Sequence, residues 1–540
     1  MVRAPGRDRG ARARHDGPRQ VAAADRHPAL LRRPHPRIGR GGTRRAGQAV
    51  SARPWLIGRE VPRTDSHLRT GAQFVESLKD GRRVVMGARA IAEVTAEPAL
   101  RRGIDTLATL FDDQFEPATR EATTSIEPDS GARIATGWLV PRAKADLHRH
   151  MAMIRHSTFR TFGVFGRPPD YGPVKAIGFL AFNHLIEKDE PEARPKIEAF
   201  LEVGRRHNLV SADIIIDVQT DRKRPMPEQA GRLRVVEERK DGVVVSGIKA
   251  GNSVLAQGNI GTISMPPPNP TMPEECMLWS VVPAHAEGLT IVLREPATTG
   301  AEHPEDHPLD SQGEESDGLA IFEKVFIPRD HVFSFKNRAT GGAYYTLGRF
   351  AQFKIAARLS VRAEIFAGAA QAIVEALGTD HIPGVRALVA DVCAYAATLK
   401  AFMVAALERA QPTESGVWLP DPVLVTACRL HSVVELPKIM QHLRELSGQG
   451  LISRVPRAAW ERQDVGPLLD AYLPGFNVGA RQKNRLFNLI WDMTSSAAAM
   501  RIALFENLNA TPAAALREEL YRTYDRREGL GLIRKKAGLE

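Results

Sequence analysis

The residues best suited to chemistry lie in one short segment, residues 161–171, with the sequence TFGVFGRPPDY. A predicted helix ends at Gly163 and Gly166, and the two prolines after Arg167 cannot continue it. The loop is rigid and presents a guanidinium and the phenol of Tyr171, a combination suited to binding an anion or polarising an oxygen atom. From the residues alone, a helix-ending turn with a surface arginine is the commoner explanation.

A second candidate is the pair of carboxylates Asp213 and Asp217. Both lie on a predicted strand, where an offset of four residues places two side chains on one face. Asp221 follows four residues later, and Arg222 comes directly after it. The pair is either part of a site or the polar face of a half-buried strand, and the periodicity alone favours the second interpretation.

Motifs of several other chemistries are missing from the sequence. It has no GxxxxGK[ST] phosphate loop, no GxSxG nucleophile elbow and no HExxH helix. Cys276, Cys393 and Cys428 are far apart and lack the spacing of metal ligands, so we predict no metal site and no disulfide scaffold.

The positive charge of the chain is concentrated at its start. Residues 1–60 hold fifteen arginines, no lysine and four acidic residues, whereas basic and acidic residues balance from residue 61 onward. The Arg-, Pro-, Gly- and Ala-rich residues 1–65 cannot bury a core, and we interpret them as a disordered or spurious extension rather than a nucleic-acid-binding arm. With no long apolar stretch and no secretory signal, we expect a cytoplasmic protein without nucleic-acid or membrane partners.

The elements around the candidate residues follow the order helices, strands, helices. Apolar spacing predicts early helices over residues 98–111, 143–165, 179–185 and 194–205. Short β-branched runs then predict strands, with a hairpin turn at Lys240-Asp241-Gly242 and an acidic surface loop over residues 298–318. Long helices are predicted over residues 346–377, 384–409, 422–446 and 480–506.

This order predicts an α+β fold with three domains after the N-terminal extension. We expect an N-terminal helical domain over residues 66–209, a β-rich, barrel-like middle domain over residues 210–337 and a C-terminal helical bundle over residues 338–540.

Four longer segments combine into a specific pattern. They are RTGAQFVESLKDGR at residues 69–82, FGRPPDY at 165–171, DGVVVSGIKAGNS at 241–253 and NLIWDMTSSAAAMRIALFE at 488–506. In this order they resemble the 4-hydroxyphenylacetate 3-monooxygenase family, the oxygenase components of two-component flavin systems. The resemblance extends over about four fifths of the chain.

The resemblance implies an acyl-CoA-dehydrogenase-like fold and assembly as a homotetramer or homodimer. It implies FAD in its reduced form, FADH₂, supplied by a separate NAD(P)H-flavin reductase, with O₂ as co-substrate. Residues 497–500 depart from the family's pattern. Carried over by position, the flavin-contacting residues are Gln219, Thr220, Asp221, Arg222, Ser253, Ser496 and Arg501.

The catalytic set implied by the resemblance is an arginine, a tyrosine and a histidine. Arg167 and Tyr171 match the first two, but Asp213 stands at the position of the histidine. An ionised carboxylate there would repel a phenolate and could pair with an amine or another cationic group. We therefore assign Asp213 the third role in altered form, as a base or a substrate anchor.

The function implied is FADH₂-dependent hydroxylation of an aromatic or heteroaromatic substrate, and Asp213 suggests a substrate other than a simple phenolate. Two alternatives stay open: a cluster-free flavin-dependent dehydratase or isomerase acting on an acyl-CoA-like substrate, and a non-catalytic flavin-binding homologue.

Overall fold

The computed structural model describes residues 55–60, 67–221, 223–229, 231–265 and 271–539. Most of the predicted N-terminal extension and Arg222 lie outside the described residues. Three residues within the predicted extension are part of the fold. Leu56 and Ile57 are buried in a hydrophobic core, and Trp55 stacks on the His331 ring. These apolar side chains interrupt the otherwise arginine-rich segment, and they pack as core residues do.

The part of the chain up to His207 is mostly helical, and it also contributes strands. The predicted helix over residues 98–111 is confirmed as α2, whose apolar side chains recur at helical spacing and face the core. The elements are α1 (Gly71–Ser77), β1 (Arg83–Met86), β2 (Arg89–Ile91), α2 (Pro98–Asp112), α3 (Arg120–Thr123), β3 (Thr124–Ile126), β4 (Arg133–Ala135), α4 (Lys144–Arg160), α5 (Val174–Ala181) and α6 (Ala193–His207).

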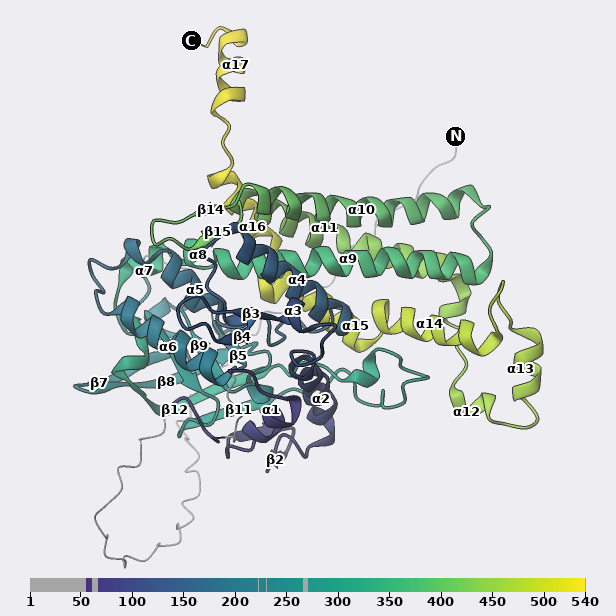
Figure 1. Cartoon of the computed structure of the whole chain (residues 1–540), viewed down its shortest axis with the longest axis horizontal. Helices are drawn as coiled ribbons and strands as arrows, with labels where there is room; N and C mark the ends of the chain where they lie inside the picture. The colour runs from purple at the N-terminus through teal and green to yellow at the C-terminus, as the bar shows by residue number, and fades with distance from the viewer. Residues whose placement is uncertain (1–54, 61–66, 222, 230, 266–270, 540) are drawn as a thin grey trace, which may run out of the picture. The chain divides into compact units, whose positions relative to one another are not determined.

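The middle of the chain forms two sheets (Figure 1). Its strands are β5 (Ser211–Ile214), β6 (Ile216–Asp217), β7 (Arg234–Arg239), β8 (Gly242–Ala250), β9 (Ile260–Ile263), β10 (Leu278–Pro283), β11 (Leu289–Leu293), β12 (Gly318–Pro328) and β13 (Val332–Phe335). Among the described residues the larger sheet has the order β2-β1-β11-β12-β8-β6, with β7 paired to β8, and the smaller has the order β13-β10-β9-β5. The predicted hairpin at Lys240-Asp241-Gly242 is confirmed as the β7–β8 turn.

Strands β1 and β2 join the larger sheet, where β1 runs parallel to β11. The N-terminal segment is therefore not purely helical, because its apolar residues Val84 and Met86 complete the core of the middle sheet. The proposed boundaries after residues 209 and 337 fall between α6 and β5 and between β13 and the first C-terminal helix.

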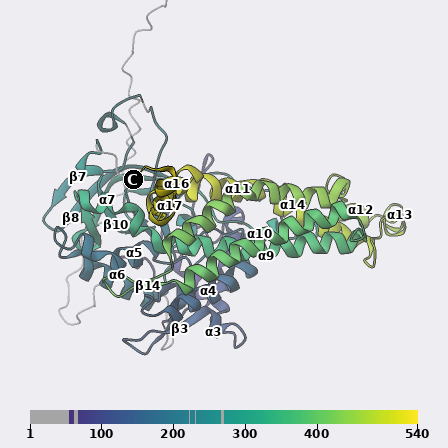
Figure 2. The same cartoon turned by 90° about the horizontal axis from the view of Figure 1, so that it is seen from above.

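The remainder of the chain is a helical bundle, in which α9, α10 and α11 lie side by side and extend away from the strands (Figure 2). Its elements are α7 (Arg338–Gly342), α8 (Tyr344–Leu347), α9 (Arg349–Leu377), α10 (Pro383–Glu408), β14 (Gln411–Pro412), β15 (Trp418–Leu419), α11 (Pro422–Ser447), α12 (Arg457–Trp460), α13 (Gly466–Tyr472), α14 (Ala480–Thr494), α15 (Ala497–Leu504), the π-helix η9 (Phe505–Ala510), α16 (Ala513–Thr523) and α17 (Arg527–Ala537). The predicted long helix over residues 480–506 is interrupted at Ser495, because the Ser496 hydroxyl accepts the Ala499 N–H and caps a new helix.

Helix α10 is, by length and composition alone, apolar enough to cross a membrane. It packs against α9 and α11 through buried side chains such as Leu399 and Met403, so we interpret it as a bundle helix.

Candidate active site

A cavity of ≈ 710 Å³ lies where the two sheets meet the start of the helical bundle. Its walls come from the loop before α5, the ends of β5, β6 and β8, the start of α9, and η9. The charged and aromatic side chains that line it are Arg167, Tyr171, Lys175, Asp213, Asp217, Arg232, Tyr344, Tyr345 and Phe505. The three predicted catalytic residues thus share one cavity.

Arg167, Tyr171 and Asp213 are in mutual contact. The Tyr171 hydroxyl donates a hydrogen bond to Asp213 Oδ2 over 3.1 Å, and Arg167 Nε lies 4.0 Å from the same oxygen. The Arg167 guanidinium carbon lies 4.3 Å from the Tyr171 ring centroid and 4.9 Å from that of Phe505. The guanidinium is held between two aromatic rings, so its direction is set before any ligand binds.

The loop that presents Arg167 depends on its glycines and on one buried carboxylate. Gly163 has φ +66°, a left-handed conformation that ends the turn after α4. A Cβ on Gly166 would lie 2.5 Å from a carbon of the Phe505 ring, so only glycine fits. The backbone N–H groups of Gly166 and Arg167 both donate to the Glu315 carboxylate, over 2.9 and 2.7 Å.

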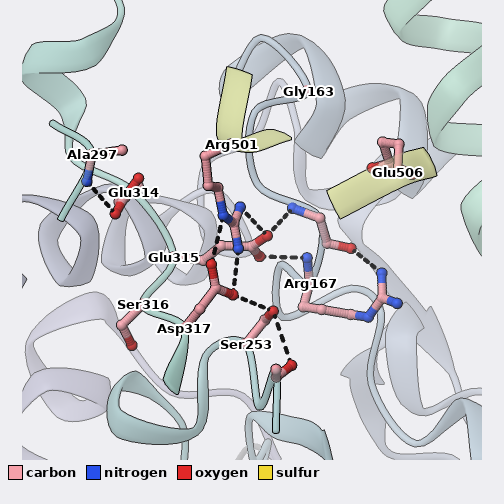
Figure 3. A network of polar contacts seen from close by, with 12 residues as sticks. Gly163, Arg167, Ser253, Ala297, Glu314, Glu315, Ser316, Asp317, Arg501 and Glu506 are labelled. Atoms are coloured by element: carbon pink, nitrogen blue, oxygen red, sulfur yellow. Dashed lines mark hydrogen bonds and ion pairs between the residues drawn. The ribbon is translucent and has the colours of Figure 1, made fainter. Parts of the chain in front are cut away.

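Glu315 belongs to an anchor network, which we define as Arg294, Glu315, Asp317 and Arg501. Figure 3 shows Glu315, Asp317 and Arg501. Arg501 donates to Glu315 over 2.8 Å and, through Nε, to Asp317 over 2.7 Å. Arg294 donates to Asp317 over 2.9 Å. These buried charges fix the loop that follows α4 to the segment before β12 and to α15, so elements distant in sequence hold Arg167 in place.

Burial and the neighbouring charges set the protonation of the cavity wall. Burial, supported by Asp213, raises the pKa of the Tyr171 phenol well above its ordinary value, so the hydroxyl stays a hydrogen-bond donor. Burial opposes the charge of Arg167, but Tyr171, Asp213 and buried carboxylates nearby outweigh it and raise its pKa. Burial lowers the pKa of Lys175 despite the attraction of Asp213.

The two candidate carboxylates do not share one strand, as the spacing had predicted. Asp213 lies on β5 of the smaller sheet and Asp217 on β6 of the larger one, because the chain changes sheets at Ile215. Both still line the cavity. Asp217 accepts a 2.7 Å hydrogen bond from Lys249 and pairs with Arg232, so its charge is already compensated.

The predicted flavin contacts are only partly gathered at the cavity. Thr220 and Ser253 line it, whereas Gln219 and Asp221 are exposed beside it. Arg222 lies outside the described residues. The Asp221 carboxylate instead accepts the backbone N–H of Lys223 over 3.0 Å.

Ser253, Ser496 and Arg501 all have partners within the chain. The Ser253 hydroxyl donates to Asp317 over 2.6 Å, and Ser496 caps α15. Arg501 is engaged by two carboxylates. Their contacts with flavin stay predictions, and for Arg501 the geometry supports a structural role in the anchor network.

Sequence reasoning missed Glu315, Asp317, Lys175 and Arg232. The first two lie in the acidic segment over residues 298–318, which was expected at the surface, yet Glu315 is 0% exposed. An acidic run carries no signal of burial, because its partner Arg501 is distant in sequence. Lys175 carried a usable signal: a charged residue inside an otherwise apolar helix, VKAIGFLA.

His307, Asp310 and Asp492 place one potential ligand atom each within 4.8 Å of one another. Asp492 accepts the backbone N–H groups of Leu309 and Asp310, over 3.0 and 3.2 Å. The cluster therefore has a structural explanation as a loop cap on α14.

Comparison with known proteins identifies the class. The N-terminal part of the 4-hydroxyphenylacetate 3-hydroxylase family matches residues 70–334, and its C-terminal part matches residues 340–538. The chain belongs to this family. The acyl-CoA-dehydrogenase-like order of helices, sheets and helical bundle is confirmed.

Individual relatives share this architecture. The chain is 30% identical to the oxygenase component of 4-nitrophenol 4-monooxygenase/4-nitrocatechol 2-monooxygenase of Rhodococcus opacus, over 83% of this chain and 87% of the relative. It is 28% identical to the FADH₂-dependent monooxygenase TftD of Burkholderia cepacia, over 83% and 88%. The crystal structure of the oxygenase component (HpaB) of 4-hydroxyphenylacetate 3-monooxygenase, complexed with FAD and 4-hydroxyphenylacetate, matches with a TM-score of 0.81 and 27% identity, covering 87% of this chain and 99% of that one.

Proposed function

We propose that this protein is the oxygenase component of a two-component monooxygenase that uses FADH₂ and O₂ to hydroxylate a phenol. The observation that carries the proposal is the contact among Arg167, Tyr171 and Asp213 on one wall of the cavity. Several relatives are named for phenolic substrates, including 4-nitrophenol and 4-hydroxyphenylacetate.

The cavity has the character that a flavin requires. Its volume lies in the range of cofactor sites, and aromatic rings and hydroxyl groups share its walls. Arg232 lines it, and its Nε is buried without a hydrogen-bond partner among the described residues. We assign Thr220, Arg232 and Ser253 to the flavin, since each brings a polar group to the cavity.

The bound reduced flavin supplies the electrons that activate O₂. The side chains of this chain do the rest. Arg167 orients an oxygen atom of the substrate, Tyr171 keeps its proton and donates a hydrogen bond, and Asp213 accepts a proton. Arg167 and Tyr171 are buried in the cavity wall, and this low exposure to water strengthens their interactions with a ligand.

The proposal requires a separate reductase that reduces FAD with NAD(P)H, as in relatives described as oxygenase components. We also propose a homodimer or homotetramer, because α10 exposes apolar residues such as Val404, which is 55% exposed. A cytoplasmic location agrees with three free cysteines.

The test supplies FADH₂, ¹⁸O₂ and either 4-hydroxyphenylacetate or 4-nitrophenol to the purified chain. We expect a product with one additional oxygen atom, labelled from O₂, and none with oxidised FAD. Arg167→Met is expected to lose most of the turnover. Product formed without O₂ would refute the proposal and favour a dehydratase or isomerase. No conversion of either phenol would refute phenol hydroxylation.

A further inference from the structure

The charges that line the cavity do not balance in pairs. Asp217 is held by Lys249 and Arg232. Arg167 has Asp213 beside it and is further stabilised by the buried carboxylates Glu315 and Glu506. Of the three cations that line the cavity, Lys175 alone has no ion pair with a carboxylate of the described chain.

Lys175 is the second residue of α5 and is only 7% exposed. Among the described residues its ammonium has no hydrogen bond and no ion pair. Its neighbours are Asp213 on β5, Arg167 in the loop, and the Tyr344 ring on α8, whose centroid lies 5.8 Å from Nζ. A buried ammonium without a hydrogen-bonding partner costs folding free energy, so a cation in this position marks a candidate binding site for an anion.

The surroundings indicate which anion it is. A carboxylate arrives ionised and needs no proton acceptor, whereas a phenol, with a pKa of about 10, must lose a proton to become an anion. Asp213 lies near Lys175 and already accepts a hydrogen bond from Tyr171. A proton acceptor, a hydroxyl donor and an unpaired cation together suit a phenol that ionises on binding.

We propose that Lys175 is a catalytic residue that binds the substrate's phenolate oxygen. The O–H bond of the phenol breaks, the proton moves to the Asp213 carboxylate, and the electron pair stays on the oxygen beside the Lys175 ammonium. The phenolate donates electron density to the ring carbons next to the oxygen, which prepares them for hydroxylation. This inference rests on the proposed function and removes the reason for expecting a substrate other than a phenolate, since Lys175 offsets the charge of Asp213.

The test uses 4-nitrophenol, whose phenolate and neutral forms have different absorption spectra, and the flavin-free protein under anaerobic conditions. At a pH below the pKa of free 4-nitrophenol, we expect the wild-type protein to bind it as phenolate. Lys175→Met should bind it about tenfold more weakly or worse, and in the neutral form. Lys175→Arg should keep the phenolate spectrum. Lys188→Met, at an exposed lysine outside the cavity and outside α10, is the control and should behave as wild type.

A second readout separates binding from folding. Because the Lys175 ammonium has no hydrogen bond or ion pair within the described chain, Lys175→Met should leave the thermal unfolding temperature unchanged or raise it, which a lysine with a structural ion pair would not do.

The inference would be overturned if 4-nitrophenol did not bind, if the wild-type protein bound it in the neutral form, or if the phenolate spectrum were unchanged in Lys175→Met. Phenylacetate, which has a carboxylate and no phenol, tests whether Lys175 binds a carboxylate instead of a phenolate. If its binding falls in Lys175→Met as much as that of 4-nitrophenol, Lys175 binds carboxylates and the inference is wrong. Neither flavin nor O₂ is present, so a failure here is distinct from a failure to hydroxylate.

Discussion

The anchor network and the catalytic wall, by which we mean Arg167, Tyr171, Lys175 and Asp213, meet at a single residue and differ in how their charges are paired. The backbone N–H of Arg167 belongs to the network, whereas its side chain belongs to the wall. In the network, Glu315 and Asp317 each accept several charge-assisted hydrogen bonds. On the wall, the Lys175 ammonium has no hydrogen bond or ion pair within the described chain.

The difference separates scaffold from site. A buried carboxylate whose oxygens all accept hydrogen bonds has no capacity to bind a ligand. Removing it leaves its hydrogen-bond donors buried without an acceptor. A wall with one unpaired cation and one carboxylate in contact with a hydroxyl can bind and exchange protons with a ligand. Buried charged residues of similar types therefore stabilise the fold in the anchor network and are available to a ligand on the catalytic wall.

The largest effect is expected in the anchor network. Glu315→Ala would leave Arg501 Nη1 and two loop N–H groups without their acceptor, at a cost of about 3–5 kcal/mol of unfolding free energy. Urea unfolding measures the change. Glu302→Ala, on an exposed glutamate of the same segment, is the control and should change stability by less than about 0.5 kcal/mol. Equal effects of the two substitutions would show that the network does not anchor the loop.

On the catalytic wall the loss should appear in rate rather than in stability. Asp213→Asn removes the proton acceptor and should slow hydroxylation about a hundredfold with little change in unfolding temperature. The other cavity carboxylate gives the contrast, because Asp217→Asn leaves Lys249 and Arg232 without a counter-charge and should mainly lower stability. Single-turnover rates and thermal unfolding of both variants test this. If Asp213→Asn loses stability instead, Asp213 is structural.

Much of this arrangement was visible in the sequence, for reasons that particular residues make clear. The prolines after Arg167 and the apolar spacing of α2 are local signals, and both the loop and the helix were predicted. The pairing of Arg501 with Glu315 joins positions 186 residues apart, and nothing local reports it. The change of sheet at Ile215 likewise depends on the partner strands β9 and β8, which periodicity along one strand cannot reveal.

Lys354 is intermediate between the paired cations of the anchor network and the unpaired Lys175, because it is buried and its hydrogen-bond partner is an uncharged carbonyl group. Its ammonium donates to the Asp170 carbonyl oxygen over 2.8 Å, and burial lowers its pKa to about 7. Between pH 7 and about 10 the unfolded chain therefore holds a proton on this lysine that the folded chain lacks, so stability should rise with pH there.

The contribution of Lys354 amounts to at most about 1.4 kcal/mol per pH unit. Urea unfolding from pH 7 to pH 10 tests this, with Lys354→Met expected to lose this part of the slope. Parallel pH profiles for Lys354→Met and wild type would show that Lys354 stays protonated in the fold.

The smallest effect should come from Ser253, where the anchor network meets the cavity. Its hydroxyl donates to Asp317 and also lines the cavity. If the hydroxyl serves the network alone, Ser253→Ala should cost about 1 kcal/mol of stability and leave FAD affinity unchanged. We expect both stability and FAD affinity to fall, the latter by less than about tenfold, because Asp317 is already held by two arginines and Ser253 is free to share its hydroxyl. Equilibrium titration with FAD, beside thermal unfolding, decides whether this serine belongs to the scaffold or to the site.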